Sequence, residues 1–129
     1  MHCKPIRSLI YLNEKNQLIS ASDDLHINVT NIHNKNKLEY SLVGHKDIIT
    51  CMNSYKIMYN NKEYYLLVTG SLDGNIKFWD IEKNYLEVQN IKFKSEILDM
   101  CITEDGEYIV IGTNEGCEVI KKNNNCNIN

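Results

Sequence analysis

The feature that most constrains this fold is an internal repeat within the 129 residues of the chain. One copy reads S-A-S-D-D-L-H-I-N-V-T-N-I over residues 20–32, and a second reads T-G-S-L-D-G-N-I-K-F-W-D-I over residues 69–81. A histidine precedes each copy, and 43 residues separate His2 from His45. A third, weaker copy begins at Ile111. A repeat of this length predicts supersecondary units that stack on one another and share a continuous core.

Apolar and polar residues alternate inside each copy, which is typical of strands rather than helices. Asp73-Gly74 and Asp105-Gly106 are hairpin turn signals between such stretches. The sequence therefore predicts an all-β fold of short antiparallel strands. We expect strands over residues 6–11, 18–22, 27–32, 38–42, 48–52, 64–69, 76–81, 85–89, 97–103, 108–112 and 117–121. No fourth strand is evident in the third unit, and the 55–65 segment is expected to be either a solvated loop with an aromatic anchor or a partner contact.

These strands divide into units over residues 1–43, 44–92 and 93–121, the last of them incomplete. The remaining residues, 122–129, read K-N-N-N-C-N-I-N and are polar and low in complexity. Such composition cannot form an apolar core, so we expect a disordered tail there.

Gly44-His45, followed by T-G-S-L-D-G-N-I-K-F-W-D over residues 69–80, resembles the WD-repeat signature. The first copy departs from it at Thr30-Asn31, where Trp-Asp is the family pattern, and the third copy has Phe93 in the histidine position. The resemblance implies a WD-repeat β-propeller, with three four-stranded antiparallel blades out of a seven-bladed ring. Propellers close with about 4–8 blades, so we expect the chain to be a fragment.

Two short stretches are more distinctive: P-I-R-S-L at residues 5–9 and A-S-D-D at residues 21–24. They are similar to the WD-repeat subunit shared by the superkiller complex and the RNA polymerase II-associated factor complex. That resemblance implies a non-catalytic scaffold with protein partners, acting in mRNA decay or transcription elongation, in the cytoplasm and nucleus. Another WD-repeat adaptor, in ubiquitin ligation or chromatin work, is the alternative.

The resemblance also implies a structural network in each blade, in which an Asp bonds a His, the His a Ser, and the Ser a Trp indole. In the second unit its members are His45, Ser71, Asp73 and Trp79. In the first unit His2, Ser22 and Asp24 can form most of it, but Thr30 cannot supply the indole. His45, Ser71 and Asp73 are also the residue types of a hydrolase triad. A hydrolase remains a remote alternative, because no G-x-S-x-G elbow is present.

Loops beside these network residues are the expected partner-binding surface. In propellers of this family they lie on one face, which receives peptide segments. We therefore expect contacts from Lys4, Asp23, Lys46, Asp47 and Leu72.

Composition weighs against other ligands. The net charge is −3 and the pI is about 5.8, whereas domains that bind phosphate backbones carry a basic face. The 5 cysteines form no C-x-x-C pair, so we expect mostly buried thiols, with no metal and no cofactor. His26 and His33 are expected to face solvent. No apolar run is long enough for a membrane helix, and no signal peptide is evident.

Both outer units keep unbroken core patterns and show no polar cap of the kind that terminal repeats need. We expect a truncated gene model whose exposed faces associate with the missing blades or with another copy of the chain.

Overall fold

Residues 1–121 are described in the computed structural model of the protein, and they form three antiparallel sheets, here called blades 1, 2 and 3. Blade 1 contains β1 (Ile6–Leu12), β2 (Gln17–Ser22), β3 (His26–Asn31) and β4 (Lys37–Val43). Blade 2 contains β5 (Ile49–Tyr59), β6 (Lys62–Ser71), β7 (Asn75–Asp80), the short 3-10 helix η1 (Ile81–Lys83) and β8 (Leu86–Lys92). Blade 3 contains β9 (Ile97–Ile102), β10 (Tyr108–Thr113) and β11 (Gly116–Lys121). The expected tail, 122–129, lies outside the described residues.

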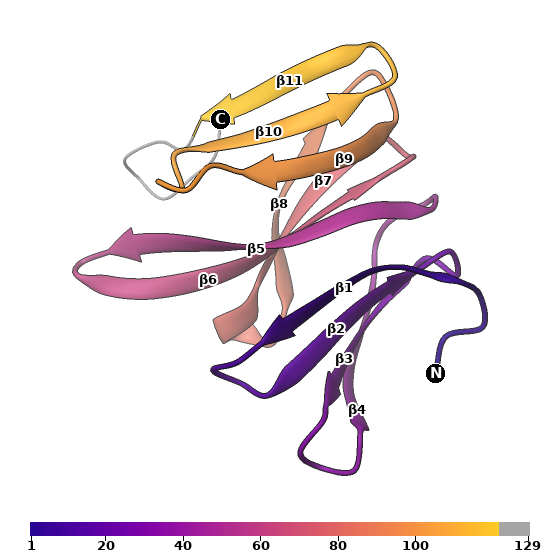
Figure 1. The fold of residues 1–129 in the computed structure, drawn as a ribbon, viewed down its shortest axis with the longest axis vertical. Helices are drawn as coiled ribbons and strands as arrows, with labels where there is room; N and C mark the ends of the chain where they lie inside the picture. Colours follow the sequence, from indigo (N-terminus) through magenta and orange to yellow (C-terminus); the bar gives the residue numbers. More distant parts are fainter. Residues whose placement is uncertain (122–129) are drawn as a thin grey trace.

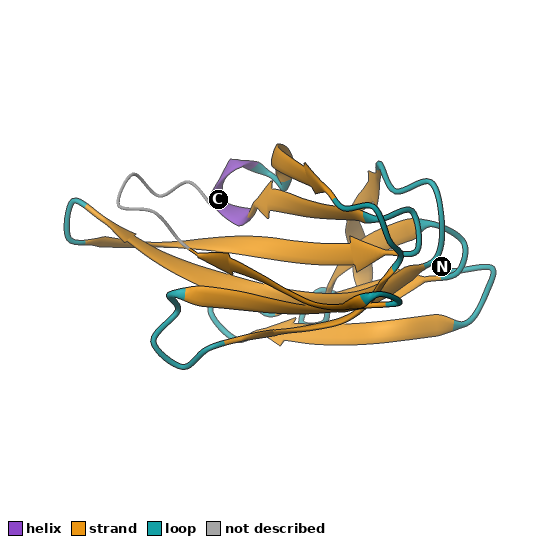
Figure 2. Cartoon of the chain, turned by 90° about the horizontal axis from the view of Figure 1, so that it is seen from above, coloured by secondary structure: helices purple, strands orange, loops and turns teal. Residues whose placement is uncertain are grey.

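Each blade is a meander in which strands that follow one another in the chain are hydrogen-bonded neighbours. Blades 1 and 2 have four strands, and the part of blade 3 that the structure describes has three. The predicted all-β fold of antiparallel blades is therefore confirmed. The first strands of the blades, β1, β5 and β9, lie side by side in that order (Figure 1). Seen from above, the described chain consists of strands and loops apart from η1 (Figure 2).

Blade 2 lies between two apolar clusters because its strands present alternate side chains to opposite faces. Leu67 and Trp79 pack with the core of blade 1. Ile76 and Phe78 pack with the core of blade 3. Both faces of blade 2 are thus covered, which accounts for the burial of every residue over 66–71 in β6 and 76–79 in β7.

The 55–65 segment is a hairpin, so the expectation of a loop there is wrong. Strands β5 and β6 stay paired in register from Tyr55↔Leu66 to Tyr59↔Lys62. The turn at Asn60-Asn61 has positive φ at both residues, which asparagine tolerates and a two-residue hairpin needs. The Tyr55 hydroxyl donates to the carbonyl of Gly106 at 2.7 Å. This bond connects the base of the hairpin to blade 3, and the far end of the β5–β6 hairpin extends past the neighbouring blades (Figure 1).

The β2–β3 turn holds a leucine in a glycine conformation. Leu25 has φ +73°, close to the φ of +83° at Gly74 in the corresponding β6–β7 turn. A left-handed conformation costs a residue with a Cβ roughly 1–2 kcal/mol. Leu25→Gly is therefore expected to raise the free energy of unfolding by about 0.5–1 kcal/mol, measured by urea denaturation.

Leu72→Gly is the matched control, because Leu72 lies in the same kind of turn without a positive φ. Glycine there adds freedom to the unfolded chain and removes a half-buried side chain, so we expect a loss of about 0.5–1 kcal/mol. Equal effects of the two substitutions would contradict the strain at Leu25.

Candidate functional site

Blade 2 contains a buried relay of hydrogen bonds that joins β6, β7 and the turn between them to the loop before β5. Nδ1 of His45 lies 3.2 Å from Oδ2 of Asp73, and Nε2 of His45 lies 2.7 Å from Oγ1 of Thr69. The Trp79 indole donates to the same Thr69 oxygen at 3.0 Å. Since the indole can only donate, the Thr69 hydroxyl has its own proton free for Nε2 of His45. That arrangement assigns the His45 proton to Nδ1, which donates to Asp73.

Thr69 takes the place that the sequence analysis gave to Ser71, so that part of the predicted network is wrong. Ser71 is also buried, but its Oγ donates to the Asp47 carbonyl at 3.0 Å and accepts from the Asp73 amide at 3.1 Å. Ser71 and Thr69 are two positions apart on one strand and share a face. Because Ser71 is fully enclosed and its hydroxyl is committed to backbone groups, it cannot serve as a hydrolase nucleophile.

Blade 1 repeats the relay with the same correction. His2 contacts Asp24 at 2.9 Å and Oγ of Ser20 at 2.8 Å, so Ser20 fills the position predicted for Ser22. Ser22 Oγ donates to the Lys4 carbonyl at 3.0 Å. Thr30 occupies the register position of Trp79, each paired with a leucine of the preceding strand. Blade 1 therefore has the His–Asp end of the relay without the indole.

The hairpin turns that carry Asp24 and Asp73 are held by equivalent sets of bonds. Each aspartate accepts from an amide of the loop before its blade, Cys3 at 3.1 Å and Lys46 at 2.8 Å. Each also accepts from the amide two residues onward, in His26 and Asn75. The carboxylates therefore fix the turn and the loop of each blade to each other, at the same end of both blades.

Blade 3 replaces the relay with apolar residues. Phe93 stands in the His45 position, Ile111 in that of Thr69, and Ile120 in that of Trp79, where it pairs with Ile109. Ile111 and Ile120 are buried in the core shared with blade 2. The β10–β11 turn is also one residue shorter than the β6–β7 turn, as the pairing of Thr113 with Gly116 shows.

Burial and hydrogen bonding set the charges in the relay. Burial lowers the pKa of His45 more than the neighbouring Asp73 carboxylate raises it, so the neutral imidazole is favoured. Burial would raise the pKa of Asp73, but the amides of Lys46 and Asn75 together with His45 outweigh burial and lower that pKa below its usual value. Burial also acts to raise the pKa of Asp24. The amides of His26 and Cys3 and the ring of His2 outweigh burial and lower that pKa to about 2.

The lowered pKa of His45 predicts a loss of stability in mild acid. A histidine whose pKa is lower in the folded state binds more protons when unfolded, so stability falls as pH decreases below about 6.5. One such group changes the free energy of unfolding by at most about 1.4 kcal/mol per pH unit. We expect urea denaturation to show a smaller decrease from pH 7.5 to 5.5 for His45→Gln than for the native sequence. An identical decrease in both proteins would contradict a neutral buried His45.

The predicted partner-contact residues lie on the loops and turns that the relay fixes. Lys4, Lys46 and Asp47 are exposed on the loops before β1 and β5, and Asp23 and Leu72 are half-buried in the two turns. Sequence reasoning missed Arg7, which makes a bidentate contact with Asp23 at 2.7 Å for each bond. The guanidinium hydrogen bonds hold the pKa of Asp23 below its usual value. Predicting this pair requires the register between β1, which contains Arg7, and β2, which leads into the turn of Asp23.

Most cysteines of the described chain are exposed, which contradicts the expectation of buried thiols. Cys51 is buried, and its burial raises the pKa of the thiol to about 11. Cys3, Cys101 and Cys117 are exposed, and Cys126 lies outside the described residues.

The histidines predicted to face solvent do so: both His26 and His33 are exposed. Within residues 1–121 no group of three His, Cys, Asp or Glu side chains is arranged to hold a metal ion. The same residues contain no helix long and apolar enough to cross a membrane.

Comparisons with known proteins agree with this geometry. Residues 36–80 match the family described as WD domain, G-beta repeat. The chain is 27% identical over 120 residues to the U3 small nucleolar RNA-associated protein 15 homolog of Xenopus laevis, which covers 93% of the chain and 22% of that protein. The crystal structure of the WD40 β-propeller domain of Doa1 superposes with a TM-score of 0.77 at 18% identity, over 97% of this chain and 39% of that one.

The chain thus spans less than half of either protein. The family match falls on β4 to β7, which contain Gly44, His45 and the Trp79 relay, and the structural match extends over all three blades. Residues 36–80 are therefore similar to the WD-repeat family, and the described residues have the fold of three blades of a WD40 β-propeller.

Proposed function

We propose that this chain is a non-catalytic protein-interaction scaffold that binds peptide segments at the end of the blades carrying Asp24 and Asp73. The observation that supports this most is the fixed geometry of that end. Two aspartates, each with backbone and histidine partners, hold the loops rigid, while Lys4, Lys46 and Asp47 remain exposed. A surface that is ordered before binding loses less entropy when a partner docks.

Three kinds of host are candidates for this scaffold. The P-I-R-S-L and A-S-D-D stretches favour the WD-repeat subunit of the superkiller and RNA polymerase II-associated factor complexes, in the cytoplasm and nucleus. The match to the U3 small nucleolar RNA-associated protein 15 homolog favours a nuclear assembly that contains this RNA. Another WD-repeat adaptor, in ubiquitin ligation or chromatin, follows if neither assembly copurifies.

Affinity purification of the tagged chain from its own cells separates the candidates. Enrichment of superkiller or polymerase-associated factor subunits by quantitative mass spectrometry supports the first. Enrichment of the U3 RNA by reverse-transcription PCR supports the second. If neither these subunits nor the U3 RNA is enriched, and other proteins are enriched in proportion to the tagged chain, the result supports another WD-repeat adaptor.

Charge reversal tests the proposed surface directly. Lys46→Glu combined with Asp23→Lys is expected to weaken capture of the copurifying partner about tenfold, because rim charges of an interface set complementarity and encounter rate. The matched control is Lys37→Glu combined with Glu104→Lys. Both residues are exposed at the opposite end of the blades, Lys37 at the start of β4 and Glu104 in the β9–β10 turn. Equal capture by both double variants, with unchanged circular dichroism, would remove this end from the interface.

A further inference from the structure

The loss of the relay in blade 3 leaves a cavity in its place. A cavity of about 370 Å³ opens at the top of blade 3, between the β8–β9 connection and the β10–β11 hairpin. Its lining residues are Lys92, Phe93, Lys94, Ser95, Thr113, Glu115 and Glu118. Phe93 holds the position that His45 has in blade 2. Glu115, whose amide donates to Oγ1 of Thr113, takes the position of Asp73, whose amide donates to Oγ of Ser71. The cavity therefore lies where the sequence of blade 3 differs from the repeat, with Phe93 in place of the histidine.

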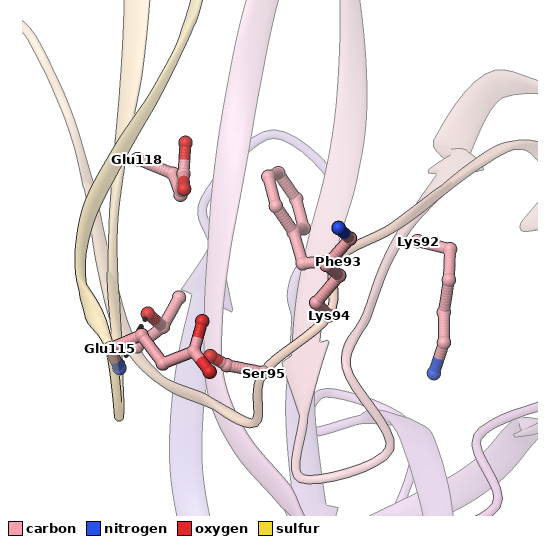
Figure 3. Close-up of a pocket in the computed structure, with 7 residues that line it drawn as sticks. Lys92, Phe93, Lys94, Ser95, Glu115 and Glu118 are labelled. Carbon is pink, nitrogen blue, oxygen red and sulfur yellow. Dashed lines mark hydrogen bonds between the residues drawn. The ribbon is translucent and has the colours of Figure 1, made fainter.

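The charges around this cavity are arranged unevenly. Glu115 and Glu118 lie on the hairpin side, and the Phe93 ring lies between them and Lys92 (Figure 3). The Lys92 ammonium donates to the Asp73 carbonyl, and its side chain points away from both glutamates. The other lysine of the lining is Lys94. On the side of the cavity away from Lys92, the carboxylates of Glu115 and Glu118 therefore share the ammonium of Lys94.

Ser95 supplies a separate sign that the cavity lacks a polar partner. Its Oγ is enclosed and has no hydrogen-bond partner within residues 1–121. Enclosed hydroxyls are normally paired, so an unpaired one in a cavity wall marks a position that a ligand donor can satisfy. In Figure 3 the hydroxyl points to the side of the cavity where Glu115 lies.

We propose that this cavity binds an arginine side chain of a partner peptide, which names the chemistry of one contact of the scaffold and rests on that proposed function. The planar guanidinium stacks on the Phe93 ring and donates to Glu115 and Glu118, with a further N–H for Ser95 Oγ. A lysine ammonium has three donors and a stronger hydration shell, and it lacks a planar face for stacking. Glu115 and Glu118, which lie together on the hairpin side of the cavity, disfavour an acidic side chain there.

Nuclear magnetic resonance titration of the whole 129-residue chain tests this site with a defined probe. N-acetyl-arginine amide is expected to give saturable shifts in the amides of Phe93, Ser95 and Glu118. N-acetyl-citrulline amide has nearly the same shape without the charge, and it is expected to bind about tenfold more weakly.

Glu115→Gln combined with Glu118→Gln is expected to weaken arginine-amide binding at least about tenfold, since hydrogen bonds to charged groups are the strong ones. Both glutamates are exposed, so the fold is expected to stay intact. Glu104→Gln is the matched control, because this exposed glutamate lies in the β9–β10 turn at the other end of the blade.

Absence of saturable shifts at the cavity, equal binding of arginine and citrulline amides, or unchanged binding by the double glutamine variant would each overturn the proposal. None of these outcomes touches the scaffold proposal, which fails only if charge reversal at Lys46 and Asp23 leaves partner capture unchanged. Arginine binding together with insensitive capture would instead retain the cavity and reject the wider surface.

Discussion

Replacing Trp79 with alanine is expected to lower the free energy of unfolding by about 3–5 kcal/mol, the usual cost of deleting a large buried aromatic side chain. Trp79 is 3% exposed and packs in the core between blades 1 and 2. Its ring also lies where a Cβ on Gly44 would come within 3.2 Å, so the loop before β5 closes directly over it. Loss of the indole would leave a cavity beneath that loop and remove one hydrogen bond from Thr69.

Two variants separate the contributions of the ring and of the relay, measured by urea denaturation. Trp79→Phe keeps most of the apolar contact but removes the donor, and we expect a smaller loss of about 1–2 kcal/mol. Thr30→Ala changes the register equivalent in blade 1, where the side chain is half-buried, and is expected to cost less than about 1 kcal/mol. If Trp79→Ala lowers the free energy of unfolding by less than about 1 kcal/mol, the indole does not close the core between blades 1 and 2.

Adding one methyl group at Gly70 is expected to destabilise the chain by about 1–3 kcal/mol, the usual range for overpacking a core. A Cβ built there would lie 2.6 Å from Sγ of Cys51 and 2.7 Å from Cγ2 of Ile97. Cys51 of blade 2 and Ile97 of blade 3 both belong to the cluster between these blades. Neither side chain can move away from the added methyl group without disturbing the packing of blade 2 against blade 3. Thermal or urea unfolding of Gly70→Ala measures this cost.

Gly112→Ala is the matched control, because Gly112 holds the same strand position in blade 3. A Cβ there comes no closer than 3.9 Å to another heavy atom, the carbonyl of Asp99. Alanine restricts the unfolded chain more than glycine, so we expect no loss and a gain of up to about 1 kcal/mol. Similar destabilisation by both substitutions would contradict a contact specific to the blade 2–blade 3 interface.

The parts of this fold that were predictable from sequence are those that depend on local alternation and turn chemistry. The β7 strand follows from Ile76 and Phe78, and its turn follows from Asp73-Gly74. The 55–65 hairpin was missed because two adjacent asparagines, rather than Asn-Gly, make its turn. Tyr and Lys also dilute the apolar alternation of that hairpin, and its pairing depends on strand register.

The relay shows a limit of another kind. His45, Asp73 and Trp79 were identified from the repeat, but Thr69 and Ser71 are both hydroxyl residues on the same face of one strand. Spacing alone cannot say which hydroxyl reaches the imidazole. The choice depends on the depth of the His45 ring in the blade, which the bond to Thr69 at 2.7 Å reveals. The exposed cysteines of blade 3 were missed because burial depends on which face a neighbouring blade covers.

The placement of blade 2 between two cores has a consequence for how the chain opens. Over residues 1–121 every hydrogen-bonded strand pair joins neighbours in sequence. Each blade can therefore form by successive local hairpins, a topology that favours rapid folding. Within the described residues blades 1 and 3 are each covered on one face, whereas blade 2 is covered on both. Either flanking blade can therefore open while the other remains packed, and amide exchange becomes slowest in β6 and β7.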